Sequence, residues 1–249
     1  MTEITVLALS GSLREKSYNT ALLHEARRLA PAGMTIEIAP LREIPLYDAD
    51  LEARGMPQAV TALSARVKTA DALLIATPEY NFSFPGVLKN AIDWLSRPPL
   101  DASLVRKAVA IAGAGGRLGS ARAQYHLRQV LGCLSMLPVP RPEVFVPNAW
   151  EKFDADGRLK DELAAKQIGD LLAALADWTM LLRRAGAASV DEGEQGRPFI
   201  FAMVAVDRAE LSLGRTTSAG EACFAKFATR PSRQVLHPKL SNQPVQSDL

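Results

Sequence analysis

Short, almost purely apolar runs alternate with amphipathic stretches along the first three quarters of the chain. The apolar runs, which we interpret as strands, occupy residues 4–9, 34–39, 72–77, 107–112 and 139–146. The stretches with apolar residues at helical spacing occupy residues 20–30, 57–70, 87–96, 120–134 and 161–184. Strands without in-and-out alternation are covered on both faces, which is typical of parallel sheets with helices between the strands. The pattern therefore predicts a doubly wound α/β domain.

Individual residues mark the ends of some predicted elements. Asn19 stands in the N-cap position of the first predicted helix, and Pro57 suits the first turn of the second. Pro140 and Pro142 interrupt the fifth apolar run. Because proline cannot donate a hydrogen bond to a neighbouring strand, we expect this fifth strand at an edge of the sheet.

The alternation of strand-like and helix-like stretches stops in the last quarter of the chain. We therefore expect a domain over residues 1–184 and a C-terminal extension over residues 185–249. The extension begins with residues 185–196, which are small, acidic and glycine-bearing, as in a linker. Residues 199–206 are typical of a strand and residues 220–228 of a short helix. The remaining residues are polar and aperiodic, so we expect partial disorder rather than a second folded domain.

The composition of the 249-residue chain is that of a globular protein, with 48% hydrophobic and 22% charged residues. The 29 Lys and Arg residues nearly balance the 27 Asp and Glu residues, which leaves a net charge of +2. Nucleic-acid binding needs a concentrated basic field, so this balance argues against a nucleic-acid partner. No apolar run reaches the roughly 18 residues of a transmembrane helix, which argues against a membrane partner.

Cysteine and histidine placement gives no sign of a disulfide framework or a metal site. Cys133 and Cys223 are far apart and have no zinc-ligand spacing, which favours a reducing compartment. The N-terminus lacks the basic region of a signal peptide, so we expect a cytoplasmic protein. His24, His126 and His237 show no ligand spacing, and we expect no metal.

Ligands of open parallel sheets bind at the carboxyl ends of the strands, where the winding reverses, so three loops matter. The first loop, residues 10–20, reads Ser-Gly-Ser-Leu-Arg-Glu-Lys-Ser-Tyr-Asn-Thr. Its hydroxyls, Arg14 and the free N–H groups of a helix N-terminus suit a phosphate monoester. The alternative is that Ser17 and Asn19 only cap a helix and Arg14 is a surface charge. Neither GxGxxG nor GxxxxGK[ST] is present here, which weakens a Rossmann dehydrogenase or NTPase hypothesis.

The other two loops offer aromatic side chains and glycines. Residues 77–86 read Thr-Pro-Glu-Tyr-Asn-Phe-Ser-Phe-Pro-Gly, and three exposed aromatics are costly unless they cover something flat and apolar. Asn81 and nearby backbone amides could bond the edge of a heterocycle, although a core-packing loop remains an alternative. Residues 113–120 hold four glycines, which let backbone approach a ligand. The three loops together predict a crevice with three walls.

Four motifs resemble the NADPH-dependent FMN reductase family of flavodoxin-like proteins, particularly its chromate and quinone reductase branch. They are Gly-Ser-Leu-Arg at 11–14 with Ser17 and Asn19, Pro-Glu-Tyr-Asn at 78–81, Leu-Lys-Asn-Ala-Ile-Asp-Trp at 88–94, and Ala-Arg with Gln-Tyr-His-Leu-Arg-Gln at 121–129. The resemblance covers residues 4–182 and implies a flavodoxin-like sheet of five parallel strands in the order 2-1-3-4-5.

The resemblance implies a non-covalent FMN, with NADPH or NADH as hydride donor and quinones, flavins or xenobiotics such as chromate or azo compounds as acceptors. The flavin carries the chemistry, so no dedicated catalytic acid or base is expected. The implied FMN-binding residues are Ser10, Ser12, Leu13, Arg14, Ser17, Tyr18, Asn19, Pro78, Glu79, Tyr80, Asn81, Phe82, Gly113, Ala114 and Gly115. A homodimer or homotetramer is implied, with Arg122, Tyr125 and Glu143 at the substrate mouth or the subunit interface.

Two residues depart from the pattern of the branch. Phe82 stands where tyrosine is frequent, and Ala114 stands where a serine or threonine commonly reaches the flavin. A different class of function stays open, namely a flavin-binding electron carrier or redox sensor without NAD(P)H turnover. Flavodoxin-type carriers are usually markedly acidic, so the sequence pI of about 8.6 favours the enzyme. The preference between NADH and NADPH also stays open.

Overall fold

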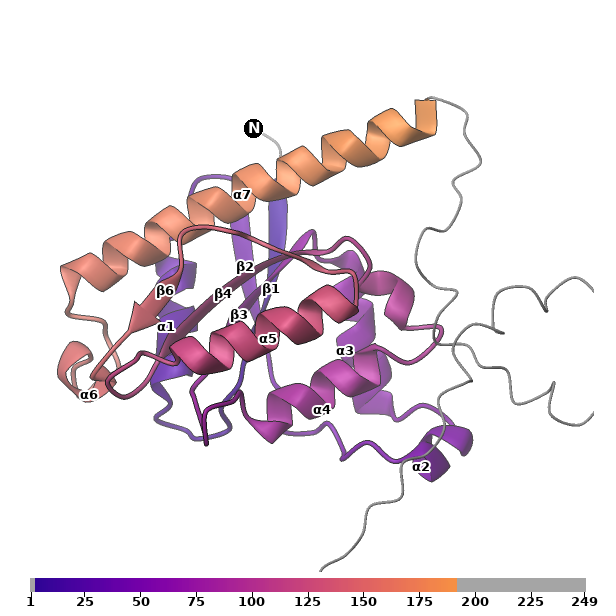
Figure 1. Cartoon of the computed structure of the whole chain (residues 1–249), viewed down its shortest axis with the longest axis horizontal. Coiled ribbons are helices and arrows are strands. Elements are labelled where there is room, and N and C mark those ends of the chain that lie inside the picture. The colour runs from indigo at the N-terminus through magenta and orange to yellow at the C-terminus, as the bar shows by residue number, and fades with distance from the viewer. Residues whose placement is uncertain (1–2, 192–249) are drawn as a thin grey trace, which may run out of the picture. The chain divides into compact units, whose positions relative to one another are not determined.

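A computed structural model describes residues 3–191 of the chain, with side chains described for residues 3–185 (Figure 1). One parallel sheet runs in the order β2-β1-β3-β4-β5, and β6 also pairs with β4. The strands are β1 (Ile4–Ser10), β2 (Met34–Ala39), β3 (Ala72–Ala76), β4 (Ala108–Ala114), β5 (Leu137–Pro138) and β6 (Val144–Val146). The predicted doubly wound flavodoxin-like fold is thereby confirmed.

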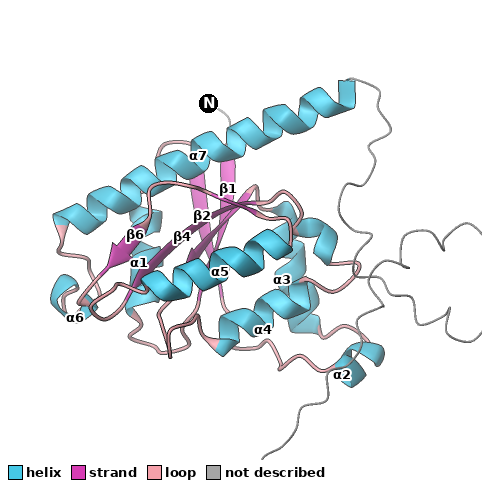
Figure 2. Cartoon of the chain, in the orientation of Figure 1, coloured by secondary structure: helices cyan, strands magenta, loops and turns pink. Residues whose placement is uncertain are grey.

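Helices cover both faces of the sheet, as the buried strands require (Figure 2). The helices are α1 (Tyr18–Arg28), α2 (Ala49–Ala53), α3 (Gln58–Thr69), α4 (Gly86–Leu95), α5 (Ala121–Cys133), α6 (Ala149–Lys152) and α7 (Glu162–Asp191), with a 3-10 turn η1 (Asp101–Ser103). On β1, Ala8 packs into the core that α1 and α7 cover, whereas Leu7 packs into the core that α3, α4 and α5 cover. Each central strand thus contributes to two cores.

The fifth strand is the largest departure from the predicted sheet. The run expected at residues 139–146 is replaced by two short strands, β5 and β6, which pair with opposite ends of β4. Pro140 and Pro142 lie between them. Since neither proline can donate to β4, the ladder is interrupted there, and the expected edge position is confirmed.

Helix ends show two further differences. Ser17, not Asn19, is the N-cap of α1, because its hydroxyl oxygen accepts from the N–H groups of Asn19 and Thr20 at 3.2 and 3.3 Å. The prediction of Asn19 as the N-cap was therefore wrong. The short helices α2 and α6 were not predicted, since four or five residues show no periodicity.

Helix α7 continues through the predicted domain boundary at residue 184 and is described as far as Asp191. The linker expected from residue 185 is therefore helical over its first seven residues. The predicted strand at 199–206, the helix at 220–228 and the disordered end lie outside the described residues. Within residues 3–191, no helix combines the length and the apolar character needed to cross a membrane.

Asp71 joins three elements at the amino end of the sheet, opposite the predicted crevice. Its carboxylate accepts from the N–H and the hydroxyl of Thr5 at 2.7 and 2.9 Å and pairs with Arg183 of α7. Burial disfavours the charged carboxylate, but the bonds from Thr5 and Arg183 outweigh it, so the pKa of Asp71 lies below its ordinary value.

Asp71→Asn is expected to lower the free energy of unfolding at pH 7 by about 1 kcal/mol, because the ion pair with Arg183 is lost. The folded-state pKa of Asp71 is lowered, so its stabilisation is present above the unfolded-state pKa of about 4 and is lost as pH falls through the folded value. Urea unfolding of the parent and the variant at pH 7 and pH 3 measures this. A difference that is as large at pH 3 as at pH 7 would contradict the account.

Candidate functional site

The loop after β1 bends around the N-terminus of α1 and exposes polar groups. The hydroxyls of Ser10 and Thr20 hydrogen-bond each other at 2.8 Å, and the Ser12 N–H donates to Ser10 Oγ at 3.3 Å. Arg14 is exposed, and its guanidinium lies 5.1 Å from the centroid of the Tyr18 ring. Within the described residues, the N–H groups of Leu13, Glu15 and Lys16 make no hydrogen bond, so the loop keeps donors available.

Asn19 has a different place from the one that sequence reasoning gave it. Its side chain is 3% exposed and forms two hydrogen bonds of 2.9 Å with Ala114 at the end of β4, one to the carbonyl oxygen and one from the N–H. The amide oxygen and the amide nitrogen are each engaged by one of these bonds. Asn19 therefore fastens the loop after β1 to β4, and the backbone of Ala114 faces Asn19.

The loop after β3 forms a two-residue hairpin turn. Tyr80 and Ser83 exchange two backbone hydrogen bonds of 2.9 and 3.0 Å across it. The two residues between them, Asn81 and Phe82, have φ angles of +50° and +66°. This conformation is uncommon for a phenylalanine, and such strain persists where surrounding contacts fix it, often at binding sites. The Phe82 side chain is 62% exposed.

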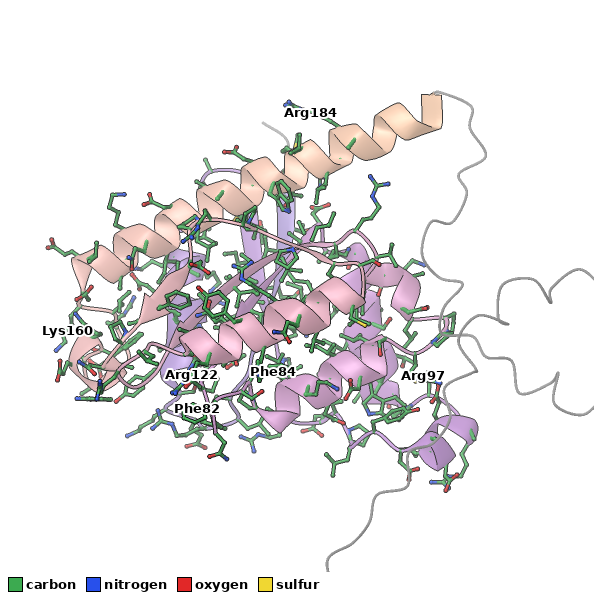
Figure 3. The ribbon with its side chains drawn as sticks, in the orientation of Figure 1. Phe82, Phe84, Arg97, Arg122, Lys160 and Arg184 are labelled. Carbon is green, nitrogen blue, oxygen red and sulfur yellow. The ribbon has the colours of Figure 1, made fainter. Side chains whose placement is uncertain are left out.

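Glu79, directly before the hairpin, makes contacts that hold the hairpin against α5. Its carboxylate accepts from the N–H groups of Arg122 and Ala123 at 3.0 and 3.4 Å, and it pairs with the Arg122 guanidinium. It thus caps the start of α5 from the loop after β3. Figure 3 shows Arg122 close to Phe82, and the guanidinium lies 3.7 Å from the centroid of that ring.

A second residue of α5 holds the far side of the same hairpin. His126 lies one helical turn after Arg122, and its Nδ1 is 3.2 Å from Ser83 Oγ. Sequence reasoning found no metal-ligand spacing at His126 and placed it in a motif of the resemblance, but it gave the side chain no role of its own. The four-residue spacing between Arg122 and His126 was the signal that could have found the pair.

The glycine-rich segment is partly strand and partly loop. Gly113 and Ala114 belong to β4, which extends two residues further than predicted. A Cβ built on Gly113 would lie 1.9 Å from Ser120 Oγ and 2.4 Å from the Thr77 carbonyl oxygen, so the protein itself fills that space. Gly116, by contrast, has open space where a side chain would start. Packing therefore explains the glycine at position 113, whereas Gly115 has only ordinary contacts and Gly116 is open.

The three residues expected at the mouth or interface are not all brought together. Arg122, on α5, packs against Phe82 of the hairpin. Tyr125 is 50% exposed, and its ring centroid is 6.2 Å from that of Phe145 in β6. Glu143 accepts from Arg141 at 2.8 Å. Tyr125 and Glu143 thus lie toward the β6 side of α5.

Hollows and exposed apolar side chains occupy different parts of the carboxyl edge of the sheet. Two hollows, of about 1020 and 730 Å³, flank α1, and neither is lined by the loops after β3 and β4. Large apolar side chains are exposed on those loops and on α5 instead, namely Tyr80, Phe82, Leu118 and Tyr125. Residues 3–185 contain no group of three or more His, Cys, Asp or Glu side chains arranged to hold a metal ion.

Comparison with known proteins identifies the family of this chain. Residues 4–151 match the family model described as NADPH-dependent FMN reductase. The NAD(P)H-dependent FMN reductase of Pseudomonas aeruginosa is 51% identical over 181 residues, which are 73% of this chain and 98% of that protein. An NAD(P)H:quinone oxidoreductase of Solanum tuberosum is 42% identical over 187 residues, which are 72% of this chain and 95% of that protein.

Among solved structures, FerB of Paracoccus denitrificans, a flavoenzyme NAD(P)H:acceptor oxidoreductase, is similar with a TM-score of 0.65. The two chains are 35% identical, and the match covers 71% of this chain and 97% of FerB. The matched family model spans the three loops described above and all six strands of the sheet that holds them. The fold, the matched family model and these relatives together show that the chain belongs to the NADPH-dependent FMN reductase family.

Proposed function

We propose that this chain is an NAD(P)H-dependent FMN oxidoreductase that passes electrons to quinones or similar small acceptors. The single observation that carries the proposal is the loop after β1, where open N–H donors, hydroxyls and an exposed arginine surround the N-terminus of a helix. This donor set fits a terminal phosphate monoester such as that of FMN. FMN, when bound, supplies the hydride and electron transfer chemistry.

Within this proposal, the loop after β1 holds the flavin phosphate through Ser12, Arg14 and nearby backbone. The hairpin after β3 and the open glycines after β4 border the ring. Asn19 and Glu79 act through other groups, since their side chains bond Ala114 and the start of α5. The remaining proposed contacts come from Ser10, Leu13, Ser17, Tyr18, Pro78, Tyr80, Asn81, Phe82 and the backbone of Ala114 and Gly115.

The acceptor class follows from the exposed aromatic side chains. Tyr80 and Phe82 are 54% and 62% exposed beside the proposed ring site, and flat apolar molecules stack on such surfaces. Quinones have this shape, and several relatives are named quinone reductases or quinone oxidoreductases. Because NAD(P)H is the donor, we place the reaction in the cytoplasm.

We further propose a homodimer, or a tetramer built from dimers, for the active protein. Leu118 and Tyr125, 49% and 50% exposed, extend the apolar surface from the hairpin toward β6. A second copy covering this surface would turn the shallow edge into an enclosed site. Sedimentation velocity of the purified protein tests this, and a monomer at micromolar concentration would contradict it.

Arg14→Gln is expected to weaken FMN binding about tenfold to a hundredfold, since a charge-assisted bond to phosphate contributes roughly 1.5–3 kcal/mol. The quenching of flavin fluorescence on titration measures the dissociation constant. Arg54→Gln, at an exposed arginine after α2, is the matched control and is expected to bind FMN as the parent does. Equal affinity in Arg14→Gln and the parent would show that the phosphate site is misplaced.

A further inference from the structure

The hairpin after β3 places a phenylalanine where its backbone geometry favours glycine. Asn81 and Phe82 are the two central residues of the turn, and their φ angles are +50° and +66°. Tyr80 and Ser83 close the turn through two backbone hydrogen bonds. A two-residue turn with positive φ at both central positions is of type I′, in which the pair Asn-Gly is preferred. A glycine would form the same turn without strain, so the turn itself does not account for the Phe82 side chain.

Arg122 of α5 covers one face of the Phe82 ring (Figure 3). The central carbon of its guanidinium lies 3.7 Å from the ring centroid, which is a contact distance for a planar cation on an aromatic face. The Phe82 side chain is nevertheless 62% exposed. A ring that is covered on one face and exposed over most of its surface offers its other face to solvent. Phe82 therefore presents a flat apolar face in a fixed orientation.

The Arg122 guanidinium is itself oriented. Glu79 accepts from its Nε and pairs with its Nη2, and the same carboxylate accepts from two backbone N–H groups at the start of α5. Since Glu79 directly precedes the hairpin, this ion pair fixes the guanidinium with respect to the turn. The other end of the hairpin is held as well, because Ser83 Oγ lies 3.2 Å from Nδ1 of His126.

Helix α5 is a firm support for these contacts. Leu127 on its inner face is completely buried, and the buried Gln124 donates to the carbonyl oxygen of Val144 in β6 at 3.0 Å. The Tyr80 ring, by contrast, makes no aromatic or cation–π contact within residues 3–185. Of the two exposed aromatic rings on the hairpin, Phe82 is thus the one that α5 holds.

We propose that Arg122 is a positioning residue that holds the Phe82 ring as a stacking surface for flat acceptors, so that Phe82 determines the selectivity for acceptors of this shape. The inference rests on the proposed function, in which bound FMN passes electrons to the acceptor. A ring that is already fixed binds a flat molecule more tightly than a free ring, because its rotamer entropy is lost before the acceptor arrives.

Reoxidation of the FMN-loaded protein, after chemical reduction and anaerobic desalting, tests the proposal without NAD(P)H. Menadione, a flat naphthoquinone, takes up two electrons from the reduced cofactor and two protons, one from the cofactor and one from solvent. Two ferricyanide ions, which have no flat apolar face, instead take up one electron each. The reactions are run in about 0.5 M salt, which screens charge effects on the ferricyanide anion.

Phe82→Gly and Arg122→Leu are each expected to raise the half-saturating menadione concentration about fivefold to thirtyfold, because the stacking surface is lost or released. The rate with ferricyanide and the dissociation constant of FMN are expected to stay unchanged. In the double variant, the increase is expected to match that of Phe82→Gly alone, since Arg122 acts through the ring.

Three further variants separate positioning from other roles. Phe82→Tyr keeps the ring and is expected to behave as the parent does. Arg122→Lys keeps a cation beside Glu79 but lacks the planar face, so an intermediate increase is expected. Gln129→Ala, at an exposed position of the same helix, is the matched control and is expected to keep the parent value.

Urea unfolding of the flavin-free variants is a second readout, which needs no bound cofactor. Arg122→Leu is expected to lower the unfolding midpoint more in the parent than in the Phe82→Gly background, because the contact between guanidinium and ring exists only in the parent. The same measurement confirms that each variant folds. Equal shifts in the two backgrounds would show that Arg122 does not hold the ring.

Three reoxidation results would also overturn the proposal. They are a parent-like menadione dependence in Phe82→Gly, an effect of Arg122→Leu that is as large in the Phe82→Gly background as in the parent, and equal losses with menadione and ferricyanide. The proposed function fails separately if NADPH does not bleach the bound flavin, because chemical reduction supplies the electrons in this test. A protein that takes up no FMN would overturn both proposals.

Discussion

Gly113→Ala is expected to lower the free energy of unfolding by about 3 kcal/mol and to abolish flavin retention, because overpacking at this point cannot relax. The added Cβ would lie 2.4 Å from the carbonyl oxygen of Thr77, which is backbone of the adjacent β3–α4 connection. It would also meet Ser120 Oγ at 1.9 Å. Moving these atoms apart separates β4 from the loop that carries the hairpin. Urea unfolding and the flavin absorbance of the purified variant measure both effects.

Gly116→Ala is the matched control for this prediction. It lies in the same glycine-rich segment, but its added Cβ would meet no atom within 4 Å. We expect parent-like stability, because the added Cβ meets no protein atom. A second control, Gly113→Ala combined with Ser120→Gly, removes the hydroxyl contact but leaves the Thr77 carbonyl, so it is expected to remain unstable. Full recovery in this double variant, or a stable Gly113→Ala, would contradict the packing described at Gly113.

Asn19→Ala is expected to lower the free energy of unfolding by roughly 2–4 kcal/mol, because the buried N–H and carbonyl of Ala114 would each lose their partner. FMN binding is expected to weaken as well, although the side chain does not face the ligand. The reason is that Asn19 fastens the phosphate loop to β4. Urea unfolding with FMN absent and with FMN in excess separates the loss of stability from the loss of affinity.

Asn19→Asp is the graded control at the same position. The carboxylate can still accept from the Ala114 N–H but cannot donate to its carbonyl oxygen, so an intermediate loss of stability is expected. Gln129→Ala, at an exposed polar residue of α5, is expected to have no measurable effect. A parent-like Asn19→Ala with reduced FMN affinity alone would contradict the described role and restore a direct ligand contact for Asn19.

The centre of the sheet was predictable because its strands are buried on both faces. Runs such as residues 4–9 and 72–77 contain too few polar residues for a half-exposed strand, and they became β1 and β3 within one residue. The division of the fifth strand was visible as Pro140 and Pro142 but was underestimated. The sequence indicated an interruption, whereas pairing geometry decided that two separate strands result.

The partners of the site residues were not predictable, because they depend on long-range contacts. Asn19 and Ala114 are 95 positions apart, and Glu79 and Arg122 are 43 apart. A polar residue in a loop carries no sign of whether it faces a ligand or a distant backbone group. The glycine at position 113 is similar, since only the packed structure reveals that Ser120 and Thr77 occupy the space of its side chain.

The central claim is that the three loops hold an FMN that NAD(P)H reduces. The most direct test is the visible absorption spectrum of the purified, FMN-reconstituted and desalted protein, recorded anaerobically before and after NADPH is added. The account predicts flavin bands that survive desalting and bleach with NADPH. Bands that persist after both NADPH and NADH would favour an electron carrier or sensor. A colourless protein that takes up no FMN would contradict the cofactor and the proposed site.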